Sequence, residues 1–205
     1  MTALQAAQPA LVLASASAAR GSLLRGAGIR FEAVAAAVDE TAAKQAAKAG
    51  GASGGEAALL LAGLKAAAVA RRRPEALVIG CDQILVCGGT WFDKPADRAA
   101  ARAQLLALRE ATHILETAVV CHRHGAEIWR HLARPRLTMR GFSEAFLDAY
   151  LAAEGEAVLG SVGAYRIEGR GALLFERIEG EQAAIMGLPL LPLLAFLRQH
   201  RVLAA

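Results

Sequence analysis

Two periodicities of hydrophobic and polar residues alternate along the chain. Short apolar runs bounded by glycine, proline and polar residues indicate strands, whereas longer stretches with apolar residues every three or four positions indicate helices. The runs predict strands at residues 10–14, 31–36, 77–87, 112–122, 126–140, 164–168 and 171–178. The longer stretches predict helices at residues 18–28, 56–72, 95–109, 143–154 and 188–200. We therefore expect a mixed α/β fold with a mostly β middle.

Polar residues and glycines mark the ends of several elements. Asp97 and Ser143 stand where a side-chain oxygen caps the first turn of a helix, and Gly155 follows the second of these helices. The glycine-rich segment at residues 48–57 separates helical stretches, and we expect it to form a loop near a cleft. These signals concern folding rather than chemistry.

The length of the chain and its composition limit the class of protein. At 205 residues it is long enough for one large α/β domain, or for two lobes sharing a cleft, and we expect residues 1–205 to form a single domain. Apolar residues make up 55% of the chain, which excludes disorder. Lys65, Pro189 and Pro192 interrupt the longest apolar runs, so no uncharged span of about 18 residues exists to cross a membrane. No Lys or Arg precedes Arg20, so the positive flank of a signal peptide is missing, and we expect a cytoplasmic protein.

Charge and cysteine content narrow the function only slightly. The net charge of +4 suits a polyanionic ligand, but so small an excess does not separate nucleic acid from nucleotide binding. The only basic run, residues 71–73, is typical of a solvated helix end, and we expect no stable nucleic-acid partner. The three cysteines lie in apolar segments without a C-x-x-C pair, which predicts buried free thiols rather than a zinc or redox site.

The segment ALVIGCDQILVC, residues 76–87, has the composition of a buried strand but carries Asp82 and Gln83 at its centre. An unpaired buried carboxylate is costly, so Asp82 requires a metal ion, a cation or a network of hydrogen bonds. One interpretation is a functional carboxylate. The other is a structural ion pair with Lys94 or an arginine, and this segment alone does not decide between them.

Other polar residues are weaker candidates. Asp39 and Glu40 are adjacent after a predicted strand, although an acidic pair in a loop is more often solvated than functional. Glu168 lies in the glycine-rich stretch at residues 163–180, where glycines mark turns or a close approach of the backbone to a ligand. His122 and His124 share one face of a predicted strand and could bind a metal, an interpretation that we do not favour.

Several of these motifs together resemble one family. LASASAARGSLL, VDET, LAGLKA, IGCDQ, DKP, THILETAV and GAYRIEGRGALLFERIEGE followed by MGLPL have the order and spacing of the Maf family of nucleoside triphosphate pyrophosphatases. The resemblance covers about residues 10–197. It implies a two-lobed, inosine-triphosphatase-like α/β fold with a curved mixed β-sheet around a central cleft, often as a homodimer. It also implies hydrolysis of a nucleoside triphosphate to the monophosphate and pyrophosphate with a divalent metal such as Mg²⁺, Mn²⁺ or Co²⁺.

The resemblance assigns roles to charged residues. Cleavage between the α and β phosphates needs an activated water and cations along the phosphate oxygens. Asp82 would be the base that activates water, directly or through the metal, and Glu40 would be a second metal carboxylate. Lys65 and Lys94 would hold phosphates as point charges.

The stretch LASASAARGSLL would meet the triphosphate at a strand-to-helix turn. There Ser15, Ser17 and Arg20 would contact phosphate oxygens, assisted by the free N–H groups of the helix start. The alternative is a purely structural arrangement, with a serine capping the helix and an exposed arginine.

Three positions bear on the choice of base. Members acting on dTTP and UTP typically read S-x-S-P-R-R, Asp-Thr and a late I-Q-G, whereas those acting on 7-methyl-GTP read S-x-S-P-W-R, Asp-Gln and a late S-E-G. Gln83 and Glu168 match the second type, and Ala19, in the place of the bulky selector, matches neither. A carboxylate only accepts hydrogen bonds, so Glu168 suits the two donors on the guanine edge, and a guanine-type nucleotide is favoured.

Two other functions are compatible with these residues. One is a nucleotide-binding regulator of cell division without turnover. The other is a housekeeping pyrophosphatase acting on deaminated purine nucleotides. The set of Asp82, Glu40 and the lysines favours an enzyme, because simple binding does not require a catalytic base.

Overall fold

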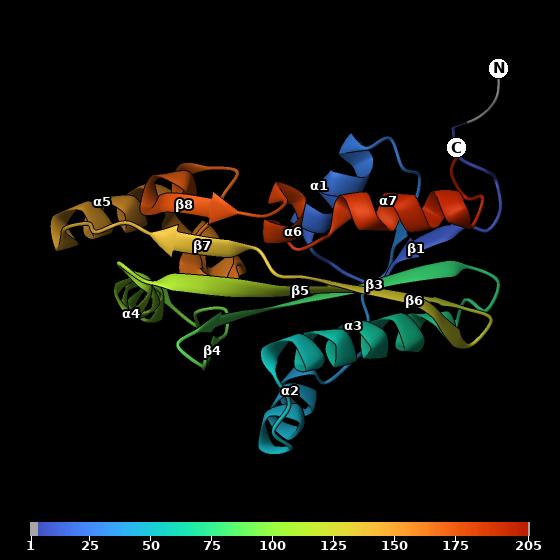
Figure 1. The fold of residues 1–205 in the computed structure, drawn as a ribbon, viewed down its shortest axis with the longest axis horizontal. Coiled ribbons are helices and arrows are strands. Elements are labelled where there is room, and N and C mark those ends of the chain that lie inside the picture. The colour runs from blue at the N-terminus through green and yellow to red at the C-terminus, as the bar shows by residue number, and fades with distance from the viewer. Residues whose placement is uncertain (1–3, 205) are drawn as a thin grey trace. The chain divides into compact units, whose positions relative to one another are not determined.

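The predicted alternation of strands and helices forms a mixed β-sheet flanked by helices in the computed structural model, which describes residues 4–204 (Figure 1). Within these residues the sheet has eight strands in the order β2-β1-β3-β5-β7-β8, with β4 paired to β3 and β6 paired to β5. The strands are β1 Leu11–Leu13, β2 Glu32–Ala33, β3 Leu77–Cys87, β4 Thr90–Phe92, β5 Thr112–Arg123, β6 Ala126–Ala133, β7 Arg136–Met139 and β8 Phe175–Glu179. The α-helices are α1 Ala18–Gly26, α2 Glu40–Ala49, α3 Gly54–Ala70, α4 Arg98–Leu108, α5 Glu144–Glu154, α6 Gln182–Ile185 and α7 Leu190–Gln199. The α/β fold class expected from the sequence is confirmed.

The chain divides into two compact units. The first contains the residues up to Asp82, Thr117–Ala133 and the residues from Gly187 onward. The second contains Gln83–Glu116 and Arg134–Met186. Strands β3 and β5 each supply residues to both units.

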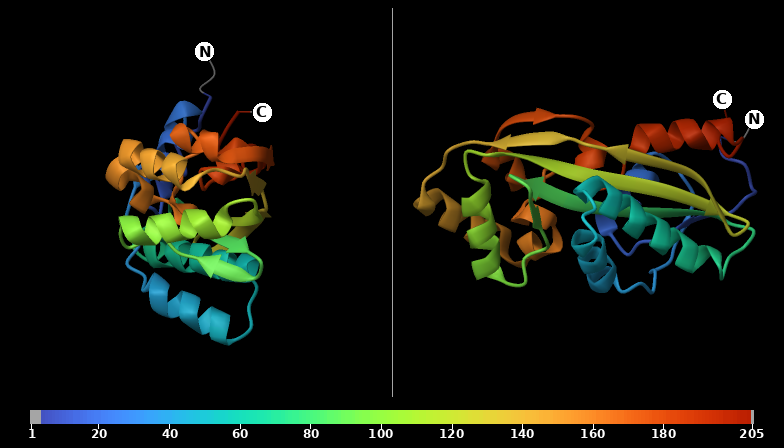
Figure 2. Two further views of the ribbon diagram at one scale, coloured as in Figure 1. Left: turned by 90° about the vertical axis from the view of Figure 1, so that its left-hand side faces the viewer. Right: turned by 60° about the horizontal axis from the view of Figure 1, so that its bottom comes forward.

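The first unit combines three parallel strands, β2-β1-β3, with the antiparallel pair of β5 and β6, and helices cover both faces of the parallel strands. Strand β1 pairs in parallel with β2 and β3, with Leu13 opposite Ile79. Because side chains alternate along a strand, Leu13 and Ile79 pack with residues of α1 and α7, whereas Val12 and Val78 pack with α3 (Figure 1). Helix α2 lies beside α3 in the same unit (Figure 2).

The second unit is built around antiparallel pairs and has its own core. Strand β7 lies between β5 and β8 and is antiparallel to both. The buried residues of this core come from the strands, from α4 and α5, and from the 3₁₀ segments η1 Gly155–Gly160, η2 Val162–Ala164 and η3 Arg170–Leu174.

Four strand predictions are corrected. The strand predicted at residues 31–36 is reduced to the two residues of β2, and turns or 3₁₀ segments alter the other three. The strand predicted at residues 126–140 is interrupted near Pro135 and becomes β6 and β7, because proline cannot donate to the ladder. The strand predicted at 164–168 is absent, and a turn at residues 167–169 follows η2. The strand predicted at 171–178 begins only at Phe175, after η3. A Cβ on Gly171 would lie 2.4 Å from the carbonyl oxygen of Arg166, so the chain folds tightly back on itself there.

The sequence analysis did not predict helix α2 or the first residues of α3. Helix α2 has no buried residue, and its apolar positions are alanines rather than the large side chains that mark the other helices. The glycine-rich segment contains the start of α3, where Ser53 and Glu56 form a reciprocal capping box. The caps predicted at Asp97 and Ser143 are confirmed. Within residues 4–204, no helix has the length and apolar character needed to span a membrane.

Candidate active site

In the first unit, β1 and β2 end while the longer parallel strand β3 continues past them. Ser15 follows β1, Glu40 starts the helix that follows β2, and Asp82 lies on β3. Carboxyl ends of parallel strands meet at one edge of a sheet, which is where ligands bind in open α/β folds. A pocket at this edge is lined by Ala14, Ser15, Ala16, Ala35, Ala36, Glu40 and Lys65.

Lys65 bridges the two candidate carboxylates. Its Nζ lies 2.7 Å from Oδ1 of Asp82 and 2.7 Å from Oε2 of Glu40. The side chains of Lys65 and Asp82 are buried, whereas that of Glu40 is 53% exposed. The cation that the buried Asp82 requires is therefore Lys65, and not Lys94 or an arginine as the structural interpretation expected.

Gly80 explains how Lys65 reaches Asp82. Gly80 and Asp82 are two residues apart and so lie on the same face of β3. A Cβ on Gly80 would lie 2.1 Å from the carbonyl oxygen of Ala62 and 2.9 Å from Cβ of Ala66. The absent side chain allows α3 to approach β3 closely, and Lys65 stands beside Ala66 on that helix.

The surroundings of Asp82 change its proton affinity. Burial raises the pKa of Asp82, and the attraction and hydrogen bond of Lys65, together with the more distant Arg20, oppose that rise without cancelling it. A carboxylate that holds a proton more readily than an exposed aspartate is better suited to accept one from water near neutral pH.

The serines and the arginine at the start of α1 form a hydrogen-bonded group. Ser17 is the N-cap of α1 and accepts from the backbone N–H of Arg20 at 3.4 Å. Ser15 Oγ accepts from Ser17 N and from Arg20 Nη1, each at 3.2 Å. Nε of Arg20 donates to the carbonyl oxygen of Gly187 at 2.8 Å. The structural interpretation is thus right about the serine cap but wrong about the arginine, which is half-buried and held.

The remaining predicted site residues occupy other positions. Ala19 is in the first turn of α1. Gln83, Lys94 and Glu168 belong to the second unit, where Lys94 and Glu168 are exposed in loops. Nε2 of Gln83 donates to the carbonyl oxygens of Ala184 and Ile185, at 3.0 and 3.1 Å.

Asp82 and Glu40 are the residues that could hold a divalent cation in the first unit. The described residues contain no group of three or more His, Cys, Asp or Glu side chains arranged to hold a metal ion. Two carboxylates nevertheless fit Mg²⁺, which usually takes one or two from a protein and completes its shell with water and substrate phosphates.

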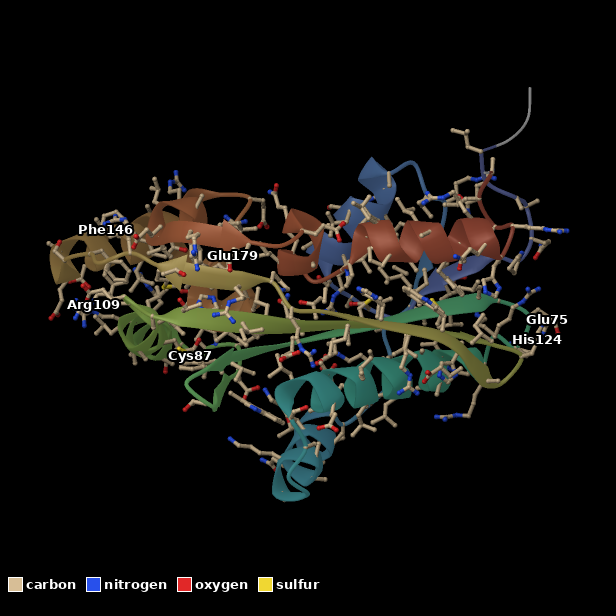
Figure 3. All side chains as sticks on the ribbon, viewed as in Figure 1. Glu75, Cys87, Arg109, His124, Phe146 and Glu179 are labelled. Atoms are coloured by element: carbon tan, nitrogen blue, oxygen red, sulfur yellow. The ribbon has the colours of Figure 1, made fainter. Side chains whose placement is uncertain are left out.

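His122 and His124 do not share a strand face as predicted, because β5 ends at Arg123. His124 lies in the following turn, where its Nδ1 is 3.8 Å from Oε2 of Glu75 (Figure 3).

Together the fold and this group of side chains define a class of protein. Hydroxyls and an arginine at the turn from β1 to α1, with a buried lysine on α3, are groups that bind phosphate esters, so the class is an α/β protein that binds phosphorylated ligands. Comparison with known proteins then gives the family, because the model of the family described as "Maf-like protein" matches residues 10–200. The chain belongs to the Maf family, as its motifs indicated.

Several relatives align along nearly their whole length. A protein of Granulibacter bethesdensis named nucleoside triphosphate pyrophosphatase is 57% identical, over 94% of this chain and 98% of its own. A protein of Paramagnetospirillum magneticum with the same name is 54% identical, over 92% and 97% of the two chains. A protein of Brucella abortus named 7-methyl-GTP pyrophosphatase is 45% identical, over 93% and 96%.

Sequence reasoning missed the two glycines on which this geometry depends. Gly80 stands in the middle of a predicted buried strand, where an isolated glycine is a signal of close backbone approach. Gly187 was present in the motif MGLPL, but its partner Arg20 is 167 positions away along the chain. No local pattern could indicate that contact.

Proposed function

We propose that this protein is a nucleoside triphosphate pyrophosphatase that cleaves its substrate between the α and β phosphates and releases the nucleoside monophosphate and pyrophosphate. The observation that carries the proposal is the buried Asp82, with its raised pKa, held by Lys65 beside Ser15 and Glu40. The names of relatives more than 50% identical to this chain support the same activity.

Each residue of the group has a chemical task in this reaction. Asp82 accepts the proton of the attacking water, and its raised pKa keeps that proton bound while the phosphate bond breaks. Lys65 offsets the repulsion between Asp82 and Glu40 and brings a positive charge to the pocket. Ser15, Ser17 and Arg20 bind phosphate oxygens from the start of α1, and the family resemblance assigns phosphate binding to Lys94 as well.

We also propose that Asp82 and Glu40 hold a divalent cation, Mg²⁺, Mn²⁺ or Co²⁺. Such an ion would neutralise charge on the phosphate oxygens and so assist attack by water. The two carboxylates are hard oxygen ligands, and both already lie within 2.7 Å of one ammonium group, so they converge on a single positive charge.

A guanine-type base, such as that of 7-methyl-GTP, is the proposed specificity. Glu168 supports it, because a carboxylate suits the donors on the guanine edge, and so does the name of the Brucella relative. Gln83 contributes less than its position suggested, because its amide nitrogen already donates to two main-chain carbonyls. The dTTP/UTP type remains the alternative, since Ala19 is neither the arginine of that type nor the tryptophan of the 7-methyl-GTP type.

Pyrophosphate release from a panel of nucleotides tests this function. Purified protein is incubated with GTP, 7-methyl-GTP, ITP, dTTP or UTP, with Mg²⁺, Mn²⁺ or Co²⁺ or with a chelator. We expect metal-dependent turnover that is highest with a guanine nucleotide, and its loss in D82N, which keeps the size of the side chain and folds. Nucleotide binding without turnover would instead favour the regulator of cell division, and full activity of D82N would remove Asp82 from the mechanism.

We also propose a cytoplasmic location, and the family resemblance supports assembly as a homodimer. Light scattering of the purified protein tests the second point, with a mass of twice the 21.4 kDa chain expected. A monomer mass at micromolar concentration would contradict it.

A further inference from the structure

The side chain of Arg20 is held from two sides by groups that belong to distant parts of the sequence. Nε donates to the main-chain carbonyl of Gly187 at 2.8 Å, and Nη1 donates to Ser15 Oγ at 3.2 Å. Both partners lie in the same compact unit as Arg20. A guanidinium is planar and rigid, so two such bonds determine the direction of its remaining donors.

One amino group of Arg20 is left over by this arrangement. A guanidinium has five N–H donors, and within the described residues Nη2 has no hydrogen-bond partner. Ser15, which holds the other amino group, lines the pocket beside Glu40 and Lys65. A phosphate oxygen bound near Ser15 would therefore meet an arginine already oriented, and little side-chain freedom would be lost on binding.

The backbone at Gly187 is adapted to this contact. Its φ of +102° is a conformation that side chains of L-residues rarely adopt. A Cβ there would also lie only 3.1 Å from Nε of Arg20 and 3.5 Å from Nη2. Gly187 precedes Leu188, which is fully buried, and Pro189, which is the N-cap of α7, so the carbonyl is anchored by the core on one side.

We infer that Gly187 is a positioning residue, whose carbonyl, with Ser15, orients Arg20 towards the triphosphate. The inference rests on the proposed function, in which Arg20 binds phosphate oxygens. It assigns to the start of α7 a part in substrate binding that acts only through Arg20. Any side chain at position 187 is expected to disturb both the carbonyl and the guanidinium.

The test compares G187A with a matched glycine variant. Gly125 also has a positive φ, +78°, but a Cβ there would meet nothing within 4 Å, so G125A introduces similar backbone strain away from Arg20. We expect G187A to raise KM for the best nucleotide about tenfold, as expected when one hydrogen bond to a charged group is weakened, with a smaller change in kcat. G125A is expected to leave both constants unchanged. Thermal unfolding of both variants shows whether they are folded.

A double-mutant cycle separates positioning from structural support. R20A should raise KM more than G187A does, and G187A/R20A should have the KM of R20A within about twofold, because removal of Arg20 leaves Gly187 nothing to position. Equal factors for G187A in both backgrounds would overturn the inference while leaving the role of Arg20 intact. An unchanged KM in R20A would overturn both the proposed role of Arg20 and this inference.

R20K keeps the test decisive if G187A does not fold. A lysine retains the charge but lacks the fork that donates to Gly187 and Ser15 together. We expect the KM of R20K to approach that of R20A. A KM equal to that of the native protein would show that charge alone suffices and would contradict a need for orientation.

Discussion

Lys65 is the residue on which both candidate carboxylates depend. Its ammonium group is the counter-ion of the buried Asp82 and also contacts the more exposed Glu40. The ion pair of Lys65 and Asp82 therefore contributes both to the stability of the fold and to the proposed chemistry. These two contributions respond differently to substitution, because an amide can replace a carboxylate as a hydrogen-bond acceptor but an apolar side chain cannot replace an ammonium group.

We predict that K65M destabilises the fold strongly and that D82N does not. Removing the lysine leaves Asp82 as a buried carboxylate without its counter-ion, which costs about 3–5 kcal/mol of unfolding free energy. In D82N the amide oxygen would still accept a hydrogen bond from Lys65. Urea denaturation measures both values, with K94M, at an exposed lysine, expected within about 0.5 kcal/mol of the native protein. Equal stabilities of K65M and K94M would contradict a buried ion pair.

His113 gives the second unit a dependence on pH. It is fully buried on β5, its Nε2 is 2.8 Å from the hydroxyl of Tyr165, and burial lowers its pKa from 6.5 to about 4. The unfolded chain thus binds more protons than the folded one between these values. The contribution of His113 to the unfolding free energy is therefore fully present above about pH 6.5. It is lost as the pH decreases towards 4, by up to about 3 kcal/mol.

Urea titrations between pH 4 and pH 8 check this dependence. H113F removes the titrating group and is expected to flatten the slope below pH 6.5, although it also loses the hydrogen bond to Tyr165 at every pH. Acid-sensitive carboxylates contribute in both proteins, so the difference between the two slopes is the relevant quantity. Identical slopes would mean that His113 is not held neutral.

At the scale of elements, the contact between α3 and β3 positions the candidate site. Gly80 is the point of closest approach, and the alanines of α3 that face it, Ala62 and Ala66, are fully buried. Small residues on both elements bring the two backbones together. The distance between Lys65 and Asp82 is set by this packing and not by either element alone.

We predict that G80A weakens both the fold and the activity. The added Cβ would lie 2.1 Å from the carbonyl oxygen of Ala62, so α3 must move away from β3 and carry Lys65 with it. Overpacking of this kind costs about 1–3 kcal/mol. The loss of pyrophosphatase activity should exceed the unfolded fraction measured by circular dichroism at the same temperature. A variant with native activity and stability would show that α3 adapts freely.

At the scale of the whole molecule, the candidate residues divide between the two units. Those proposed to act on the phosphates and the metal, apart from Lys94, are in the first unit, whereas Gln83 and Glu168 are in the second. We expect substitutions at the two positions proposed to select the base to change the choice of nucleotide while Asp82 and Lys65 are retained.

We predict that Q83T/E168Q shifts preference towards dTTP and UTP. Glutamine at position 168 both donates and accepts, which suits the pyrimidine edge better than a carboxylate does. The ratio of kcat/KM for dTTP to that for the guanine nucleotide should rise about tenfold, as expected from one or two exchanged hydrogen bonds. Each single variant serves as a control, and E168Q should account for most of the change. An unchanged ranking of nucleotides would contradict recognition of the base edge by residues 83 and 168.

The agreement between sequence and structure is best where a signal is local. The caps at Asp97 and Ser143, the long helices and the buried strand that carries Asp82 could all be predicted, because each depends on residues a few positions apart. Prediction failed around residues 162–174, where Gly163 and Gly171 allow turns whose stability comes from tertiary contacts. It also failed at α2, whose apolar positions are alanines and which buries no residue.

The α/β class, the family and the residue types available for phosphate chemistry all follow from the order of amino acids alone. Composition, hydrophobic period and motif order suffice for these conclusions, because none of them depends on a distance between residues far apart in the sequence. Folding in three dimensions was needed to make Lys65 the counter-ion of Asp82 and to bring Gly187 to Arg20. Those contacts join residues 17 and 167 positions apart, and the packing of whole elements, which no local pattern encodes, sets the distances between them.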